Sequence, residues 1–193
     1  ASPSRSPPLG SPPDPETGSV IINNAIGIKD ASDFDEGLSA RRAGVIKVIQ
    51  MPPAAWIVWV RPQLEITAIT YSGRMEEEEP EESPFFHVRQ RVVLYARVWS
   101  DGVASPSVTW GALVDNHDHK LEDHSWGPSG FTGPYIGNFD QKYIPKLFPP
   151  GTWVAVEVGV KLRNHFIVDD FILKSIMNVN IAIKKIGIKL TGL

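Results

Sequence analysis

The amino-acid sequence predicts an all-β protein built as an antiparallel β-sandwich. Three observations carry this prediction: apolar and polar residues alternate in several segments, Gly and Pro separate those segments, and no segment has the apolar period of a long helix. Hydrophobic residues make up 42% of the 193 residues, which is enough for a sizeable core. We therefore expect an arm over residues 1–18 and one sandwich domain over residues 19–193.

The expected N-terminal arm is extended and rich in proline. Proline fixes the backbone φ angle and has no N–H to donate, so we expect this stretch to join neither a helix nor a strand ladder. Two roles fit it: a linker, or an arm that lies on a neighbouring subunit. Its prolines are Pro3, Pro7, Pro8, Pro12, Pro13 and Pro15.

The segment 86–99 is the clearest predicted strand, because its side chains separate into two faces at a period of two. The apolar face comprises Val88, Val92, Leu94, Ala96 and Val98. The other face comprises Arg89, Arg91, Tyr95, Arg97 and Trp99. The segment 154–162 alternates in the same way. The closing segment 178–190 changes its apolar phase at Lys184–Lys185, which predicts a β-bulge.

Weaker patterns bring the expected total to seven to nine strands. They occupy 19–28, 45–50, 56–60, 64–71 and 108–114, with breaks at Pro52–Pro53 and Arg61–Pro62 and a turn at Asp101–Gly102. Segment 30–42 is predicted as a short helix or a loop, and the glutamates of 76–82 as an exposed acidic loop. Segment 115–143 is predicted as a long loop that is functional or conceals short strands.

Three segments together resemble a known family. They are the strand Val88–Val98, the sequence Gly151-Thr152-Trp153 that opens another alternating strand, and the closing strand Asn180–Ile188. This layout is similar to that of the carbohydrate-binding-module-like, or galactose-binding-like, jelly-roll β-sandwiches, which also occur in phage capsid-decoration and tail-fibre proteins. The resemblance implies a jelly roll with a sugar-binding or virion role. It also implies a calcium ligand on the closing strand, but Lys184 and Lys185 stand at the matching positions and offer no lone pair while charged.

The charged and aromatic face of segment 86–99 is a candidate ligand-binding surface. Aromatic rings give flat platforms for sugar rings, and arginine forks bind hydroxyls, carboxylates or phosphates. The alternative is that these side chains pair with the acidic loop or pack on a neighbouring subunit. A second candidate is the aromatic loop 126–143, where Trp126 and Tyr135 line a binding rim or a satellite core.

The segment 115–124 contains a candidate site for a divalent metal. If the preceding strand continues, His117 and His119 project to one face, with Asp123 following. This spacing resembles the first motif of the cupins, with aspartate in place of glutamate. The second cupin motif, which supplies a third imidazole, is absent, so a cupin-like metal-dependent enzyme is a distant alternative to histidines that gather by chance in a polar loop.

Composition narrows the function classes. The net charge of −3 means that no overall positive field would attract the protein to nucleic acid. The longest apolar run, 54–60, is too short to cross a membrane. The absence of cysteine excludes disulfides and thiol nucleophiles, and no catalytic or nucleotide-binding motif occurs.

We therefore expect a non-catalytic structural and recognition protein of an assembly, such as a virion component, without a cofactor. Its expected partners are copies of itself or neighbouring virion subunits, with carbohydrate as a candidate ligand. We expect it in the virion or outside the cell, although the first residues contain no signal peptide. The alternative is a carbohydrate-binding module of a larger enzyme.

Overall fold

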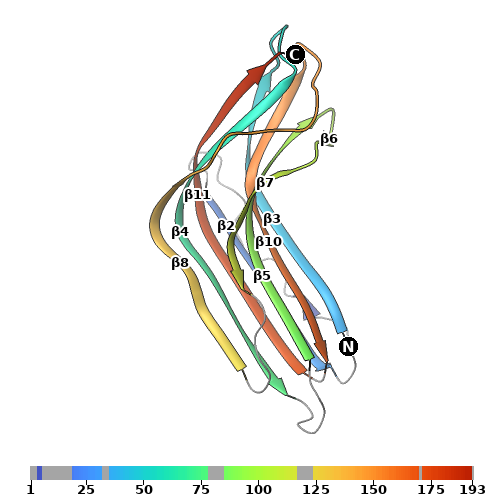
Figure 1. Cartoon of the computed structure of the whole chain (residues 1–193), viewed down its shortest axis with the longest axis vertical. Coiled ribbons are helices and arrows are strands. Elements are labelled where there is room, and N and C mark those ends of the chain that lie inside the picture. The colour runs from blue at the N-terminus through green and yellow to red at the C-terminus, as the bar shows by residue number, and fades with distance from the viewer. Residues whose placement is uncertain are drawn as a thin grey trace.

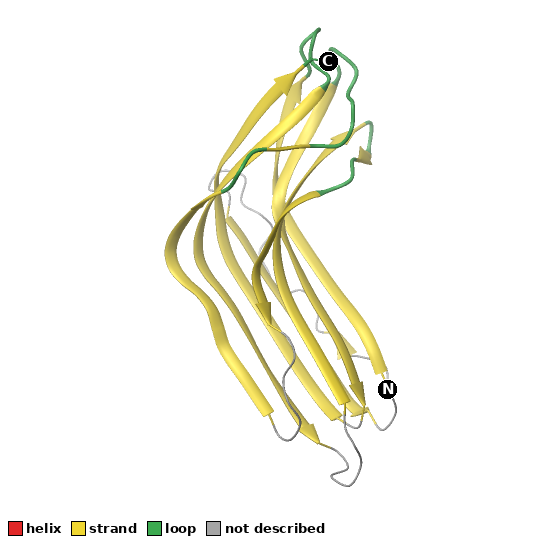
Figure 2. Cartoon of the chain, viewed as in Figure 1, coloured by secondary structure: helices red, strands yellow, loops and turns green. Residues whose placement is uncertain are grey.

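The computed structural model describes the backbone of residues 4–5, 19–31, 35–77, 85–116, 124–169 and 171–192, and the side chains of residues 40–73, 88–113, 136–165 and 179–192. Every regular element in the described backbone is a β-strand (Figure 2). Those ranges contain no helix that is long and apolar enough to cross a membrane. The all-β fold class predicted from the sequence is therefore confirmed.

Eleven strands follow one another along the described chain. They are β1 Ser4–Arg5, β2 Ser19–Ala31, β3 Asp35–Gln50, β4 Ile57–Glu77, β5 Phe85–Ser100, β6 Val103–Ala104, β7 Val108–Asn116, β8 His124–Asn138, β9 Lys142–Tyr143, β10 Trp153–Asp169 and β11 Phe171–Thr191. The long strands run together along the longest axis of the molecule and bend midway (Figure 1). They form two antiparallel sheets, which are the two layers of the predicted sandwich.

The order of the strands is that of a jelly roll. Sheet A has the order β1-β2-β11-β4-β8, with β9 also pairing with β4, and sheet B has the order β3-β10-β5-β6, with β7 also pairing with β5. The main strands are nested antiparallel pairs: β2 with β11, β3 with β10, β4 with β8, and β5 with β7. This is one long hairpin rolled so that its halves spread over two sheets, the arrangement of an eight-stranded jelly roll.

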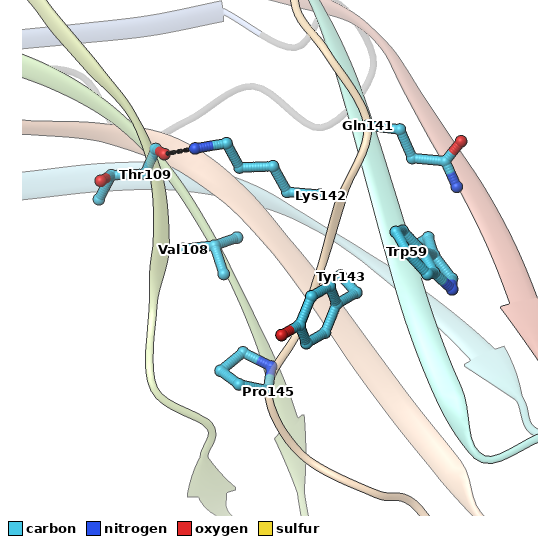
Figure 3. A pocket seen from close by; sticks show the side chains of 7 residues that line it. All are labelled: Trp59, Val108, Thr109, Gln141, Lys142, Tyr143 and Pro145. Atoms are coloured by element: carbon cyan, nitrogen blue, oxygen red, sulfur yellow. Dashed lines mark hydrogen bonds between the residues drawn. The ribbon is translucent and has the colours of Figure 1, made fainter. Parts of the chain in front are cut away.

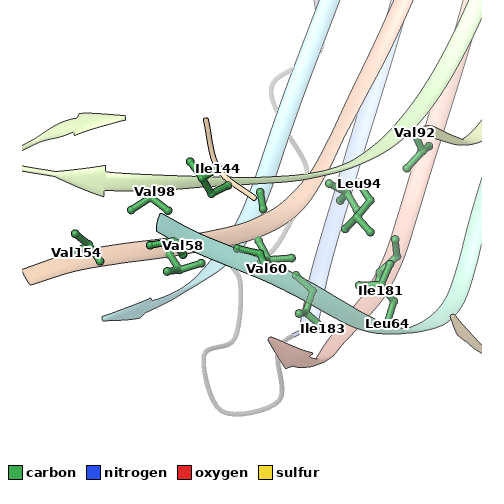
Figure 4. Close-up of a cluster of buried hydrophobic side chains, with 14 of the residues drawn as sticks. Val58, Val60, Leu64, Val92, Leu94, Val98, Ile144, Val154, Ile181 and Ile183 are labelled. Carbon is green, nitrogen blue, oxygen red and sulfur yellow. The ribbon is translucent and has the colours of Figure 1, made fainter. Parts of the chain in front are cut away.

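The hydrophobic core lies between the two sheets (Figure 4). Its buried members from sheet B are Val88, Val92, Leu94, Ala96, Val98, Val154, Val156, Val158, Val160 and Leu162. Its buried members from sheet A are Val58, Val60, Leu64, Ile66, Ile69, Val179, Ile181 and Ile183. The loop residues Met51, Ala55, Ile144 and Phe148 complete it. The burial of alternate aliphatic residues predicted for segments 86–99 and 154–162 is therefore confirmed where side chains are described, over 88–99 and 154–162.

Several local predictions are confirmed in detail. The register between β11 and β4 shifts between Ile183 and Lys185, which is the predicted bulge. Asp101–Gly102 turns the chain from β5 to β6, with φ angles of 50° and 75° that favour glycine at the second position. Pro52–Pro53 lies in the connection between β3 and β4, as expected for residues that interrupt a ladder.

The predicted break at Arg61–Pro62 is wrong, because β4 continues through both residues. Pro62 uses its carbonyl to accept a hydrogen bond from the N–H of Phe139 at 3.3 Å. The N–H and C=O of one strand residue point to the same side, so the donor that Pro62 lacks would also point there. On that side the pairing of β4 with β8 ends at Gln63, and the pairing of β4 with β9 begins at Val60. Pro62 lies between these two ladders, so its missing N–H breaks no hydrogen bond of either.

Three other segments differ from expectation. Segment 30–42 is neither helix nor loop over most of its length, because β2 extends to Ala31 and β3 begins at Asp35. Segment 115–143 contains β8, a strand of 15 residues whose glycines and prolines mask its pattern. Ser4–Arg5 pair with β2, against the expectation that the arm joins no ladder, because these two residues keep their N–H donors. Glu76 and Glu77, predicted to lie in the acidic loop, belong instead to β4. The rest of segment 1–18 and residues 78–82 lie outside the described residues.

Candidate functional site

The outer face of sheet B carries five of the predicted ligand residues. Because the even-numbered side chains of β5 and β10 face the core, the odd-numbered ones face outward. The register places Arg91 opposite Arg163 and Arg97 opposite Glu157, while Trp153 opens β10. This face therefore has a basic region, a central acidic residue and an aromatic end along one strand.

Glu157 is the centre of a hydrogen-bonded cluster on this face. Although it points outward, Glu157 is only 6% exposed. Arg97 donates from Nε to Oε2 at 2.7 Å and from Nη2 to Oε1 at 3.2 Å, and Trp99 donates from Nε1 to Oε2 at 2.5 Å. The hydroxyl of Tyr95 donates to Oε1, and the Arg97 guanidinium lies 4.4 Å from the centre of the Trp99 ring. One carboxylate therefore fixes three of the predicted ligand side chains.

The ionisation of the cluster follows from this geometry. Burial alone would raise the pKa of Glu157, but the hydrogen bonds from Arg97, Tyr95 and Trp99 outweigh it and hold that pKa below its usual value of 4.5. Burial, followed by the hydrogen bond to the Glu157 carboxylate and its charge, raises the pKa of Tyr95 well above its usual value of 10.0. The cluster thus holds an ionised carboxylate beside a neutral phenol at neutral pH.

Tyr95 is not the open platform that strand alternation predicts, because its side chain is only 2% exposed. The residue opposite it in β10 is Gly159, which pairs in turn with Gly44 of β3. A Cβ at Gly159 would lie 2.3 Å from the carbonyl oxygen of Ala43, so only glycine fits there. The backbones of β3 and β10 approach closely at these two glycines, and Tyr95 is buried beside them.

The end of the face where β10 begins is apolar and exposed. Ile46 and Val48 of the edge strand β3 are 57% and 60% exposed, and Trp153 is 64% exposed. Val48 is opposite Ala155 in the register, and Trp153 is opposite Gln50, so these side chains occupy adjoining rows. We call Ile46, Val48 and Trp153 the apolar patch. It carries no charged side chain of its own.

A cavity of about 510 Å³ opens where the two sheets meet, away from this face (Figure 3). The side chain of Lys142, in β9 of sheet A, reaches across it and donates to the carbonyl oxygen of Thr109 in β7 of sheet B at 2.6 Å. Beside this bridge, the rings of Trp59 and Tyr143 meet edge to face, with their centres 5.3 Å apart. Tyr143 is 53% exposed, so the cavity offers an accessible aromatic surface with polar groups next to it.

The remaining predicted site residues are distributed differently. Trp126 and Tyr135 lie in β8 of sheet A, so the structure places them in the sheet opposite to Arg89 and Trp99. His117, His119 and Asp123 lie outside the described residues, between the end of β7 and the start of β8. Among the residues that the structure does describe, no three His, Asp or Glu side chains gather in a way that could hold a metal ion.

Comparison with known proteins adds no family. No protein-family model and no curated protein matches the chain. One solved structure, that of the infectious bursal disease virus Gx strain, is 12% identical over 90% of this chain and 44% of that chain, with a TM-score of 0.17. A likeness of that degree carries no argument. The class of the protein, an antiparallel jelly-roll β-sandwich, rests on its own strand order.

Sequence reasoning missed the residues that organise this face. Glu157 gave no signal in the sequence, because a glutamate at an outward position fits the alternation of apolar and polar residues in a half-buried strand. Arg163 and His165 continue the outward phase of β10 beyond position 162, where the predicted strand ended. Extending the alternation by three residues would have found both. The exposure of Ile46 and Val48 had no sequence signal, because apolar residues in a strand are expected to face the core.

We expect Glu157→Ala to lower the free energy of unfolding by about 3 kcal/mol, because it leaves Arg97 without its buried partner and removes an acceptor from Tyr95 and Trp99. The control is Glu65→Ala. The carboxylate of Glu65 lies 3.1 Å from Lys184 Nζ, but these side chains are 33% and 44% exposed, so the loss should stay below about 1 kcal/mol. Urea denaturation measures both, and equal losses would show that Glu157 has no structural role.

Proposed function

We propose that this chain is a non-catalytic structural and recognition protein of an assembly, of the capsid-decoration or tail-fibre kind, and that it works in the virion or outside the cell. The observation that carries the proposal is the apolar patch, where three large side chains are more than half exposed. The fold is compatible with this role, because jelly rolls occur in viral capsid proteins, although a fold alone does not assign a function.

The partner we propose for the apolar patch is a second copy of this chain. Large exposed apolar side chains that adjoin one another mark interaction sites. Because the patch is uncharged, two copies related by a two-fold axis would bring apolar surface against apolar surface without opposing like charges. Ile46 is opposite Glu157 in the register, and Arg163, with Arg91 opposite it, lies six residues further along β10.

The contact we propose uses the face of β3 rather than its edge. β3 is at the edge of sheet B, where unpaired backbone groups invite another strand. However, Lys47 lies on the same side of β3 as Val45 and Ile49, which pack against the core. Its side chain is nevertheless exposed. An inward-pointing charge on an edge strand opposes the addition of a further strand. The face that carries Ile46 and Val48 is the remaining surface for a partner.

We expect the purified chain to form a defined oligomer, and Val48→Glu to weaken that oligomer at least about tenfold, because it buries an unpaired charge at the contact. Size-exclusion chromatography with light scattering, over a dilution series, measures this. Val103→Glu is the matched control, since Val103 is 61% exposed in β6 and Val48 is 60% exposed in β3. A monomeric parent chain would contradict the proposal, as would equal effects of the two substitutions.

A second candidate function, that of a carbohydrate-binding module, is favoured by the cavity between the sheets. Sugar rings stack on exposed aromatic rings while neighbouring polar groups bind their hydroxyls. Tyr143 supplies the exposed ring, and Gln141 and Lys142, whose side chains project to opposite sides of their segment, supply side-chain donors next to it (Figure 3). The resemblance of this chain to carbohydrate-binding jelly rolls agrees with this candidate.

If this second candidate is right, a glycan array will show a bound sugar, and Tyr143→Ala will reduce its binding at least about tenfold through the loss of the stacking ring. Tyr143→Phe keeps the ring and should bind nearly as well as the parent chain. Binding to no glycan would exclude a sugar-binding role. A bound glycan that is insensitive to Tyr143→Ala would place the sugar site elsewhere.

A further inference from the structure

A small basic pocket lies on the outer face of sheet B, at the opposite end from the apolar patch. Its volume is about 160 Å³, and it is lined by Arg89, Arg91, Arg163 and His165. β5 supplies the first two residues and β10 the others. Arg91 is directly opposite Arg163, and Arg89 is directly opposite His165. Four positions in two adjoining rows of the sheet thus bring three guanidinium groups and an imidazole to one pocket.

This arrangement places two arginines, Arg91 and Arg163, directly opposite each other on neighbouring strands. Like charges directly opposite each other on neighbouring strands are destabilising. The whole chain has a net charge of −3, so the three arginines are a local concentration of positive charge in an acidic protein. Arg91 and His165 have interactions of their own, and Asp115 of β7 is opposite Arg91 in the register. The inference therefore depends chiefly on Arg89 and Arg163.

Arg89 has a buried donor without an acceptor. Its Nε is inaccessible to solvent and makes no hydrogen bond in the described structure. A buried donor that lacks an acceptor loses its hydration without compensation, and such a group in a native protein commonly marks a bound water or ion. The open space beside the Arg89 side chain is the pocket that it lines. An oxyanion in this pocket would lie next to the guanidinium and offset the positive charge of the arginines.

We propose that Arg89, Arg91, Arg163 and His165 form a binding site for the oxyanion group of a ligand, a carboxylate, phosphate or sulfate. The planar fork of arginine matches two oxygens of such a group, which a lysine ammonium does not. The small volume admits the anionic group and leaves the rest of the ligand above the sheet. This site does not rest on the proposed function, because neither self-association through the apolar patch nor sugar binding between the sheets uses these residues.

The test is a titration of the full chain with sodium phosphate, sodium sulfate and sodium acetate, each at constant ionic strength balanced with sodium chloride. Nitrogen-15 NMR of the arginine Nε–H groups reports binding, and the Arg89 signal is assigned from its loss in Arg89→Gln. We expect a saturable shift of that signal with at least one oxyanion. The most tightly bound anion distinguishes a tetrahedral from a planar ligand group.

We expect Arg89→Gln and Arg163→Gln each to weaken binding at least about tenfold, since each removes a charge-assisted contact. Arg163 is exposed, so its substitution tests the site even if Arg89→Gln disturbs folding. Arg61→Gln is the matched control, because Arg61 is an exposed arginine of β4 in the other sheet. The absence of saturable binding by all three oxyanions would overturn the proposal. An equal loss in Arg61→Gln would also overturn it, by showing attraction to general charge.

Discussion

The inward-facing aliphatic side chains of β5 and β10 are the constraint on which the rest of the structure depends. They pack against the inward-facing residues of β4 and β11, so each sheet supplies one wall of a single core (Figure 4). Because side chains alternate along a strand, a slip of one residue would turn every valine and leucine of β10 into water. The core therefore also fixes which residues face outward, and every candidate site on sheet B consists of residues at those outward positions.

The outer face of sheet B combines three regions with different physical character. At its centre Glu157 fixes Tyr95, Arg97 and Trp99 through hydrogen bonds, so that a surface of charged and aromatic residues is largely occupied by contacts within the chain. On one side the apolar patch is exposed and uncharged, and on the other side the basic pocket contains a buried donor without an acceptor. The central cluster lies between the two outer regions, with Ile46 of the apolar patch directly opposite Glu157.

The sequence predicted the fold well where alternation was strong. Val88–Val98 and Val154–Leu162 were assigned correctly, and the phase change at Lys184–Lys185 located a bulge, because burial on one face controls those positions. The region of β8 was predicted as a functional loop or one that conceals short strands, because its glycines and prolines resemble a loop and its pairing with β4 comes from residues distant in sequence. The sites were less predictable. Alternation assigned Tyr95 to the outer face correctly, but it gave no sign that the side chain is only 2% exposed there.

The account is tested most directly by cysteine scanning along β10, which is possible because the chain has no cysteine of its own. Single cysteines at Val154, Val156, Val160 and Leu162 replace buried residues, and single cysteines at Trp153, Ala155, Lys161 and Arg163 replace residues with accessible surface. The rate of reaction of the folded protein with a water-soluble maleimide should alternate with a period of two, slow at the first set and fast at the second. Rates that are uniform, or that repeat with the period of a helix, would contradict the two-sheet core.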